Sequence, residues 1–141
     1  MRLQALSDSP DAFLALEGED DELHWREDLD QNVWCLARLA DQPVGLAKLN
    51  RVAEHKDGMH LEAVWVAPQA RHQGVGEVLV AALESIAATL GAHLLRLWVF
   101  AENHSAKNFY RQLGYTGPTR RQPIKVNDRV RFEDEYEKYL G

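Results

Sequence analysis

The sequence predicts a single α/β domain whose central sheet combines strands of both directions and is flanked by helices. Strand-like apolar runs over residues 59–66 and 94–100 are each followed by a helix-like segment, which is the alternation typical of α/β proteins. Two earlier strand-like runs, 34–40 and 44–52, are separated by a connection short enough for an antiparallel hairpin. A chain of 141 residues with 45% hydrophobic residues can bury one core, so we expect residues 1–141 to form one domain.

The first part of the chain combines helical and hairpin patterns. Helical patterning covers residues 3–16, interrupted near Ser9-Pro10, and residues 22–29. The hairpin that follows is expected to turn at Asp41-Gln42-Pro43, and a polar turn over 54–58 leads into the strand at 59–66.

The second part of the chain carries the strongest helical pattern. Apolar residues recur at helical spacing between residues 75 and 90, and Gly91 stands where a helix stop is expected. A second helix is expected over 105–113, with Gly114 at its end. The chain then closes with a long strand or a strand pair over 130–140.

The composition argues against several classes of protein. A net charge of −6 at pH 7 makes nucleic acid a poor partner. We find no apolar run near the ~20 residues that a membrane helix needs and no signal-peptide pattern, so we expect a cytoplasmic protein without a membrane partner. The single cysteine, Cys35, lies in an apolar stretch and favours a core thiol over a nucleophile. The histidine spacings build no metal site with Cys35 or the carboxylates, so no metal is predicted.

The segment Arg71-His72-Gln73-Gly74-Val75-Gly76 predicts a phosphate cradle. It lies between a strand and a helix, where glycines let the backbone approach a ligand and the helix start offers unpaired amide N–H groups and a positive dipole end. Such a glycine pair can also serve a purely structural role. Leu79 stands where a dinucleotide fingerprint would need its third glycine, and no Gly-Lys-Ser/Thr follows, so nicotinamide cofactors and nucleoside triphosphates are disfavoured.

A second motif follows the strand at 94–100, and the two motifs together resemble a known family. Arg71-x-x-Gly74-x-Gly76, followed by Asn103-x-x-Ala106-x-x-Phe109-Tyr110-x-x-x-Gly114-Tyr115, is similar to the acetyl-CoA motif pair of the Gcn5-related N-acetyltransferase (GNAT) superfamily. The resemblance covers roughly residues 59–116. It implies a mixed, mostly antiparallel sheet in which the two strands before the CoA-binding helices splay apart, with the pantetheine arm between them.

The resemblance also implies an activity. The expected reaction moves an acetyl group from acetyl-CoA, as co-substrate, to a primary amine of a small molecule or protein, by direct attack through a tetrahedral intermediate. The alternative is a non-catalytic module that binds acyl-CoA as a sensor or assembly part. Tyr110 favours the enzyme, since a pure binder has no use for an acid at the sulfur.

The resemblance assigns roles to residues of both motifs. Tyr110 would act as the general acid for the leaving CoA thiolate, although it could instead be a core aromatic beside Phe109. Asn103 would hydrogen-bond the pantetheine or the neighbouring loop, or act as a helix N-cap, or both. Further cofactor contacts are expected from the phosphate loop, from backbone groups of the cofactor strand and from the second motif: Arg71, His72, Gln73, Gly74, Val75, Gly76, Val64, Val66 and Ala106.

The base that accepts the amine proton is expected on the cofactor strand. Side chains alternate at period two, so His60, Glu62, Val64 and Val66 should share one face. His60 and Glu62 are the two candidates. Histidine titrates near the working pH, whereas a glutamate would need a raised pKa or an intervening water. Both could instead be polar residues on an exposed strand face.

One departure from the GNAT pattern concerns the start of the chain. GNAT chains usually begin with a strand before their first helix, but residues 3–13 already resemble that helix, so the usual first strand is expected to be missing. Either the sheet is one strand short, or another chain covers its edge, or the natural protein starts upstream of Met1. Because an open edge invites pairing, a homodimer is one expectation, and a monomeric mass in light scattering would argue against it.

The acceptor cannot be chosen from the sequence. The family builds the acceptor site from segments that correspond here to about residues 10–30 and 117–132. The first segment is acidic and hints at a cationic amine, while the second is basic and hints equally at a carboxylate-bearing acceptor.

Overall fold

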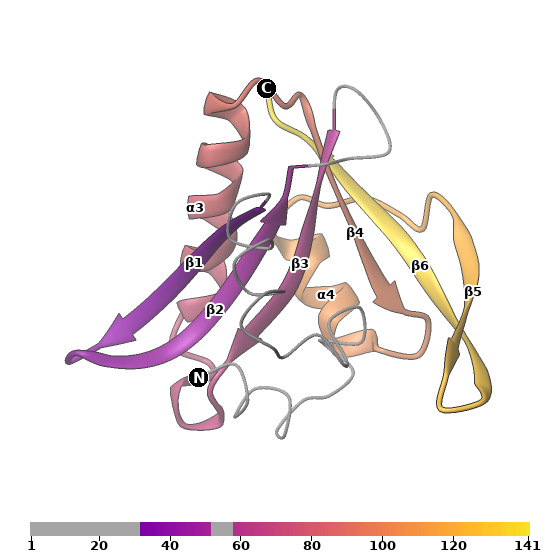
Figure 1. Cartoon of the computed structure of the whole chain (residues 1–141), viewed down its shortest axis with the longest axis horizontal. Helices are drawn as coiled ribbons and strands as arrows, with labels where there is room; N and C mark the ends of the chain where they lie inside the picture. Colours follow the sequence, from indigo (N-terminus) through magenta and orange to yellow (C-terminus); the bar gives the residue numbers. More distant parts are fainter. Residues whose placement is uncertain (1–31, 52–57) are drawn as a thin grey trace.

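The computed structural model describes residues 32–51 and 58–141 (Figure 1). Its elements in chain order are β1 (Asn32–Leu39), β2 (Gln42–Asn50), β3 (Gly58–Val66), the 3-10 helix η2 (Pro68–Ala70), α3 (Val75–Thr89), β4 (Leu94–Phe100), α4 (His104–Gln112), β5 (Arg121–Val126) and β6 (Arg129–Tyr139). The helices expected at 3–16 and 22–29, the question of the missing first strand and most of the turn at 54–58 lie outside the described residues.

The strands form one mixed sheet in the order β1-β2-β3-β4-β6-β5. Every neighbouring pair is antiparallel except β3 and β4, which run parallel and are joined through α3. A parallel pair needs such a crossover, and a helix is its usual form. The predicted α/β class with a mostly antiparallel sheet is therefore confirmed.

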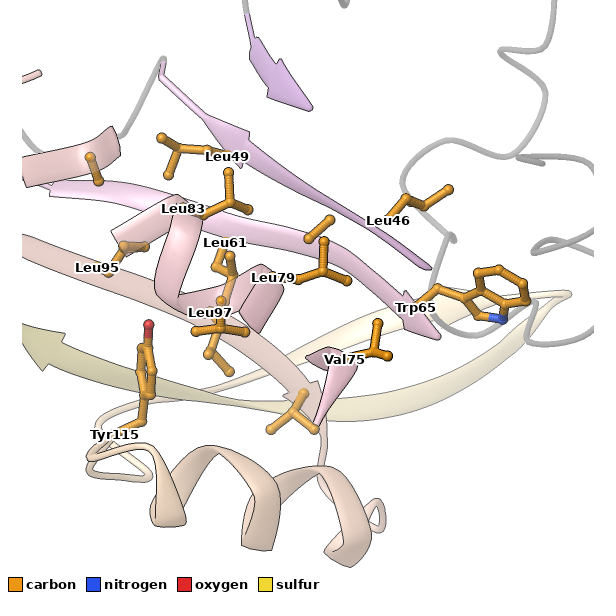
Figure 2. Packing of buried hydrophobic residues seen from close by; sticks show 14 of the residues in the cluster. Leu46, Leu49, Leu61, Trp65, Val75, Leu79, Leu83, Leu95, Leu97 and Tyr115 are labelled. Atoms are coloured by element: carbon orange, nitrogen blue, oxygen red, sulfur yellow. The ribbon is translucent and has the colours of Figure 1, made fainter. Parts of the chain in front are cut away.

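One face of this sheet, called here the helix face, is covered by α3 and α4 (Figure 1). Val75, Leu79 and Leu83 lie along one side of α3 and meet buried leucines of β2, β3 and β4 (Figure 2). The approach is close, because a Cβ added at Gly45 of β2 would lie 3.1 Å from both Leu79 and Val75. Burying each such leucine stabilises the fold by about 1.5–3 kcal/mol, so this layer fixes α3 against the sheet.

The helix boundaries follow the sequence pattern closely. α3 starts at Val75 as predicted, and β4 has the predicted bounds Leu94–Phe100, while α4 is displaced by one residue. Gly91 (φ 93°) and Gly114 (φ 98°) adopt the left-handed conformation just after α3 and α4. This is the helix-ending geometry that glycine accepts without strain.

The hairpins show where the sequence prediction was wrong. The first turn is Ala40-Asp41, so Gln42 and Pro43 belong to β2 and not to the connection. Strand β5 was missed entirely, because its polar sequence Arg121–Val126 lacks apolar alternation. Asn127-Asp128, with φ of 49° and 64°, makes the two-residue turn between β5 and β6, and this pair was the local signal that could have found the hairpin.

Among the described helices, none combines the length and apolar character required to cross a bilayer.

Candidate active site

The site is built around a split in the sheet. The structure describes both β3 and β4 in full and pairs them at only three positions, of which His60↔Arg96 is the last. Beyond it β3 runs on to Val66 and β4 to Phe100, and the two strands diverge (Figure 1). Six residues of β3, about 20 Å of strand, therefore border the split. The splayed strands expected from the family resemblance are present.

A β-bulge in β3 lies within the split. Glu62 pairs with Lys48, and Trp65 pairs with Leu46. Two residues of β3, Ala63 and Val64, therefore lie opposite one residue of β2, Ala47. Ala63 adopts a left-handed conformation with φ of 54°. A bulge of this kind adds one residue to a strand and shifts the side-chain alternation beyond it.

The bulge overturns the expectation that four residues of this strand share a face. Val66 pairs with Gly45 and lies on the helix face, where its side chain approaches the first turn of α3. His60 pairs with Asn50 and lies on the opposite face, called here the far face, together with Glu62. Val64, two residues before Val66, also lies on the helix face. The residues expected to contact pantetheine, Val64 and Val66, therefore lie on the opposite face of the sheet from the base candidates, His60 and Glu62.

The two base candidates differ in their surroundings. Glu62 Oε1 accepts a hydrogen bond from Asn50 Nδ2 at 3.2 Å, and its Oε2 lies 3.6 Å from Lys48 Nζ. The side chain of Glu62 is 32% exposed. His60 is buried at the apex of the split, between Asn50 and Arg96. One hydrogen bond and one ion pair from β2 therefore orient the glutamate while leaving part of it accessible.

The phosphate loop connects the wide end of the split to α3. After η2 the chain passes through His72 (φ 63°) and Gly74 (φ 84°), both left-handed, and Gly74 is the N-cap of α3. Within the described residues no side chain caps this helix end. Because the first amides of a helix lack partners inside it, this end of α3 can receive an anion.

The polar side chains of the loop shape its backbone. Arg71 Nε donates to the carbonyl of Val66 at 2.9 Å, and Gln73 Nε2 donates to that of Gln69 at 3.2 Å. Val75 points into the core, so its contribution to a ligand would come from its amide. Arg71 and Gln73 thus hold the cradle in shape, whether or not they also reach a phosphate.

One loop residue was missed by the sequence reasoning. Glu77 is exposed in the first turn of α3, and its Oε2 lies 3.9 Å from where a Cβ on Gly74 would be. A carboxylate here suits the helix dipole but opposes an anionic ligand at the same helix end. The residue type and its position after Gly76 were visible in the sequence.

The second motif forms the start of α4. Asn103 is its N-cap, and Asn103 Oδ1 accepts a hydrogen bond from the amide of Ala106 at 3.1 Å. The N-cap alternative for Asn103 is therefore correct. Ala106 packs against the core. Both residues fix the start of the helix that carries Tyr110.

Tyr110 belongs to an aromatic group on the helix face. Its ring packs edge-on against Phe109, with centroids 5.0 Å apart, and against Tyr115 at 5.7 Å. Burial raises the pKa of Tyr110 far above its ordinary value, so the hydroxyl stays protonated at neutral pH. A Cβ added at Gly76 would lie 3.0 Å from the Phe109 ring and 3.8 Å from Val66, which places α4 beside α3 and the end of β3.

The site therefore has two sides. The phosphate loop and Tyr110 lie on the helix face, His60 and Glu62 lie on the far face, and the split between β3 and β4 connects them. Among the described residues, no three His, Cys, Asp or Glu side chains come together as a metal site would require.

Comparisons with known proteins agree with this arrangement. The family model described as "Acetyltransferase (GNAT) family" matches residues 3–115. The peptidyl-lysine N-acetyltransferase YjaB of Escherichia coli K12 is 32% identical over 83 residues, which are 59% of this chain and 48% of that protein. An uncharacterized N-acetyltransferase of Methanocaldococcus jannaschii is 26% identical over 95 residues, 64% of this chain and 42% of that protein. The chain thus spans about half the length of these curated relatives.

Solved structures share the fold. A ribosomal-protein-alanine N-acetyltransferase from Brucella melitensis superposes with a TM-score of 0.71 at 22% identity, over 83% of this chain and 75% of that one. The protein yncA from Salmonella typhimurium, solved with its cofactor acetyl-CoA, gives a TM-score of 0.69 at 17% identity, over 84% of this chain and 70% of that one. At these identities the likeness concerns the fold alone. The family match over most of the chain, together with the split sheet and its glycine loop, shows that this protein belongs to the GNAT acetyltransferase family.

Proposed function

We propose that this chain transfers an acetyl group from acetyl-CoA to a primary amine. The observation that carries the proposal is the split between β3 and β4, followed by a glycine loop and a helix end that no side chain caps within the described residues. A split sheet offers backbone N–H and C=O groups along its inner edges, and an uncapped helix end suits a pyrophosphate. The structural relative solved with acetyl-CoA supports the choice of co-substrate.

The residues present fit this co-substrate. The pyrophosphate would bind the amides of the loop from Arg71 to Gly76, and the pantetheine arm would enter the split beside Val64 and Val66. The thioester would then lie between the two faces of the sheet. A backbone N–H of β3 could stabilise the oxyanion of the tetrahedral intermediate.

The acceptor amine would approach from the far face, where the base candidates lie. A lysine-like amine has a pKa near 10.4, so only about one part in 2,500 is neutral and able to attack at pH 7. Glu62 is the better placed base, because its carboxylate is oriented by Asn50 and Lys48 and is partly accessible. His60 remains the second candidate at the apex of the split.

Tyr110 would stabilise the leaving thiolate from the helix face. A thiol has an ordinary pKa near 8.5, far below the raised pKa of the Tyr110 hydroxyl, so complete proton transfer from Tyr110 would be unfavourable. We therefore assign Tyr110 as a hydrogen-bond donor to the sulfur. The proton lost by the amine can finally protonate CoA.

The first experiment measures acetyl-CoA-dependent release of CoA thiol across amines, amino acids, aminoglycosides and peptides. Lysine-bearing peptides lead the panel, because the E. coli relative is named for peptidyl-lysine. Saturable release with one class would establish the transfer and its acceptor. Tight acetyl-CoA binding without release across the panel would favour the non-catalytic acyl-CoA binder.

The substitution Tyr110→Phe tests the catalytic assignment. A hydrogen bond to a charged group contributes about 1.5–3 kcal/mol, so kcat should fall about 10- to 100-fold. Acetyl-CoA affinity, measured by calorimetry, should change little, because the ring is kept. Unchanged turnover in Tyr110→Phe would contradict the role of the hydroxyl.

A further inference from the structure

A buried ionic cluster lies beneath α4. Lys107 Nζ donates to the carbonyl of Ala101, just after β4, at 2.7 Å and to Asp134 Oδ2 of β6 at 2.8 Å. Arg121 of β5 binds the same carboxylate with both ends of its guanidinium, through Nε to Oδ1 at 2.6 Å and Nη2 to Oδ2 at 3.0 Å. Asp134 is fully buried and Lys107 nearly so. Four elements therefore meet at one carboxylate and one ammonium group.

The cluster holds α4 through its most buried side chain. All residues of α4 are described, and Lys107 is the most buried of them, while Ala106, Phe109 and Tyr110 are partly buried against the core and Arg111 Nη2 donates to Tyr136 Oη of β6 at 2.8 Å. Lys107 precedes Tyr110 by three residues, so the two side chains occupy neighbouring turns of the same side of the helix. A movement of Lys107 would therefore displace Tyr110.

The split sheet explains why α4 needs such a fixed point. α3 makes its main contacts with β1, β2 and β3, on one side of the split, whereas Lys107 ties α4 to β4, β6 and β5, on the other. Past His60 and Arg96, β3 and β4 have no further pairing with each other in the described structure. The phosphate loop and the tyrosine hydroxyl thus belong to different sides, and their spacing depends on how α4 is anchored.

We propose that Lys107, Asp134 and Arg121 are positioning residues that hold Tyr110 at the split, and hence at the thioester in the function proposed above. The ammonium group has directed hydrogen bonds to the Ala101 carbonyl just after β4 and to a carboxylate that is itself held by a planar guanidinium. The hydrogen bonds from Arg121 and Lys107 outweigh burial and lower the pKa of Asp134 to about 2, so the carboxylate stays ionised at neutral pH. Directed bonds of this kind fix the helix rotation more closely than apolar packing would.

Two variants separate positioning from mere stability. Lys107→Met leaves Asp134 with Arg121 alone, and Lys107→Met/Asp134→Leu replaces the buried pair by apolar side chains, which generally retains folding. Turnover is measured with the acceptor that the amine panel identifies. Both variants should keep acetyl-CoA affinity within about 2-fold and lose about 10-fold or more in kcat, as expected for loss of a charge-assisted contact at the thiolate.

A second measurement does not depend on turnover. The chain has 4 tyrosines, so 3-fluorotyrosine labelling gives few ¹⁹F resonances, and Tyr110→Phe assigns the one that matters. The Tyr110 resonance should shift or broaden in both Lys107 variants. Arg38→Met is the control, because it removes one exposed cation from β1 on the other side of the split, and it should change neither kcat nor the resonance. Compared with Lys107→Met, Lys107→Arg should restore part of kcat and part of the native Tyr110 resonance.

The outcomes are distinct. Folded Lys107 variants with normal kcat, or with an unchanged Tyr110 resonance, would overturn the proposal. Recovery of kcat in the double variant would do the same, since it would reduce the cluster to a contribution to stability. If the unaltered protein shows no turnover with any acceptor, the proposed function fails, and the Tyr110 resonance alone decides whether the cluster positions the helix.

Discussion

Glu62 and His60 show how much one extra residue in a strand matters. Both lie before the bulge at Ala63 and face away from the helices, whereas Val66 lies after it and faces α3. Without the bulge, Val66 would lie on the same face of the sheet as His60 and Glu62. In the function proposed above, the bulge would let acetyl-CoA and the amine approach from opposite sides of the sheet.

We predict that Glu62→Gln lowers kcat/KM more than His60→Asn does. Removal of a general base commonly costs about 10²- to 10⁴-fold, and the Glu62 carboxylate is oriented and partly accessible, whereas His60 is buried. The measurement is a pH–rate profile of each variant, with Asp128→Asn in the exposed β5–β6 turn as the control. Loss of the acidic limb in His60→Asn, with normal rates in Glu62→Gln, would reverse the assignment.

The phosphate loop yields a second prediction at the residue scale. Glu77→Gln should tighten acetyl-CoA binding about 2- to 5-fold, because it removes a negative charge near the helix end proposed to bind phosphate, where charges contribute about 0.3–1 kcal/mol. Calorimetry at low and high salt should show the gain shrinking as screening increases. Equal or weaker binding at low salt would mean that the carboxylate does not face the ligand.

At the scale of elements, the contact between α3 and α4 depends on a glycine. Gly76 lies in the first turn of α3, and the Phe109 ring of α4 occupies the space that a side chain would need. The missing Cβ at this position allows the close approach of the two helices.

Gly76→Ala should therefore weaken both folding and acetyl-CoA binding. The added methyl group would lie 3.0 Å from Phe109 Cζ, and overpacking of this kind costs about 1–3 kcal/mol, more than the helix propensity of alanine returns. Urea unfolding and calorimetry provide the measurements. The cost of Gly76→Ala should be smaller in a Phe109→Leu background than in the unaltered protein. If the double variant loses as much as the two single variants together, the contact between residue 76 and Phe109 is not the cause.

At the scale of the whole molecule, the cluster around Asp134 links the sheet edge to α4 and makes stability depend on pH. The pKa of Asp134 is lowered to about 2, mainly by its hydrogen bonds from Arg121, below its ordinary value of 3.8. A carboxylate with a lowered folded-state pKa contributes stability above its unfolded value and loses it as the pH falls through the folded value. The loss should therefore occur between about pH 4 and pH 2.

Asp134→Asn tests this dependence. The variant should be less stable than the unaltered protein at pH 7, since it leaves Lys107 without an anionic partner, but its stability should decline less steeply below pH 4. Urea unfolding between pH 2.5 and pH 7 measures both, with Asp128→Asn as the exposed control. Parallel curves for Asp134→Asn and the unaltered protein would show that Asp134 does not cause the acid dependence.

The sequence determined the parts of this protein that depend on local patterns. Helical spacing predicted α3 and α4, an apolar run predicted β4, and glycines at chain turns predicted the phosphate loop. All of these signals act over a few neighbouring residues. The pair of motifs was enough to indicate the family, while the catalytic role that it assigns to Tyr110 stays a prediction. Residues 1–141 as one domain and the oligomeric state stay predictions.

Tertiary structure alone decided which faces and partners these residues have. The bulge at Ala63 depends on the register against β2, so period-two alternation gave the wrong face for Val64 and Val66. Asp134 lies 27 residues from Lys107 and 13 from Arg121, so no local pattern could join them, and β5 was hidden because its pairing with β6 compensates for a sequence with little strand character. The physical reason is common to all three: pairing between strands sets which distant side chains meet, and its energy comes from contacts that a single segment does not contain.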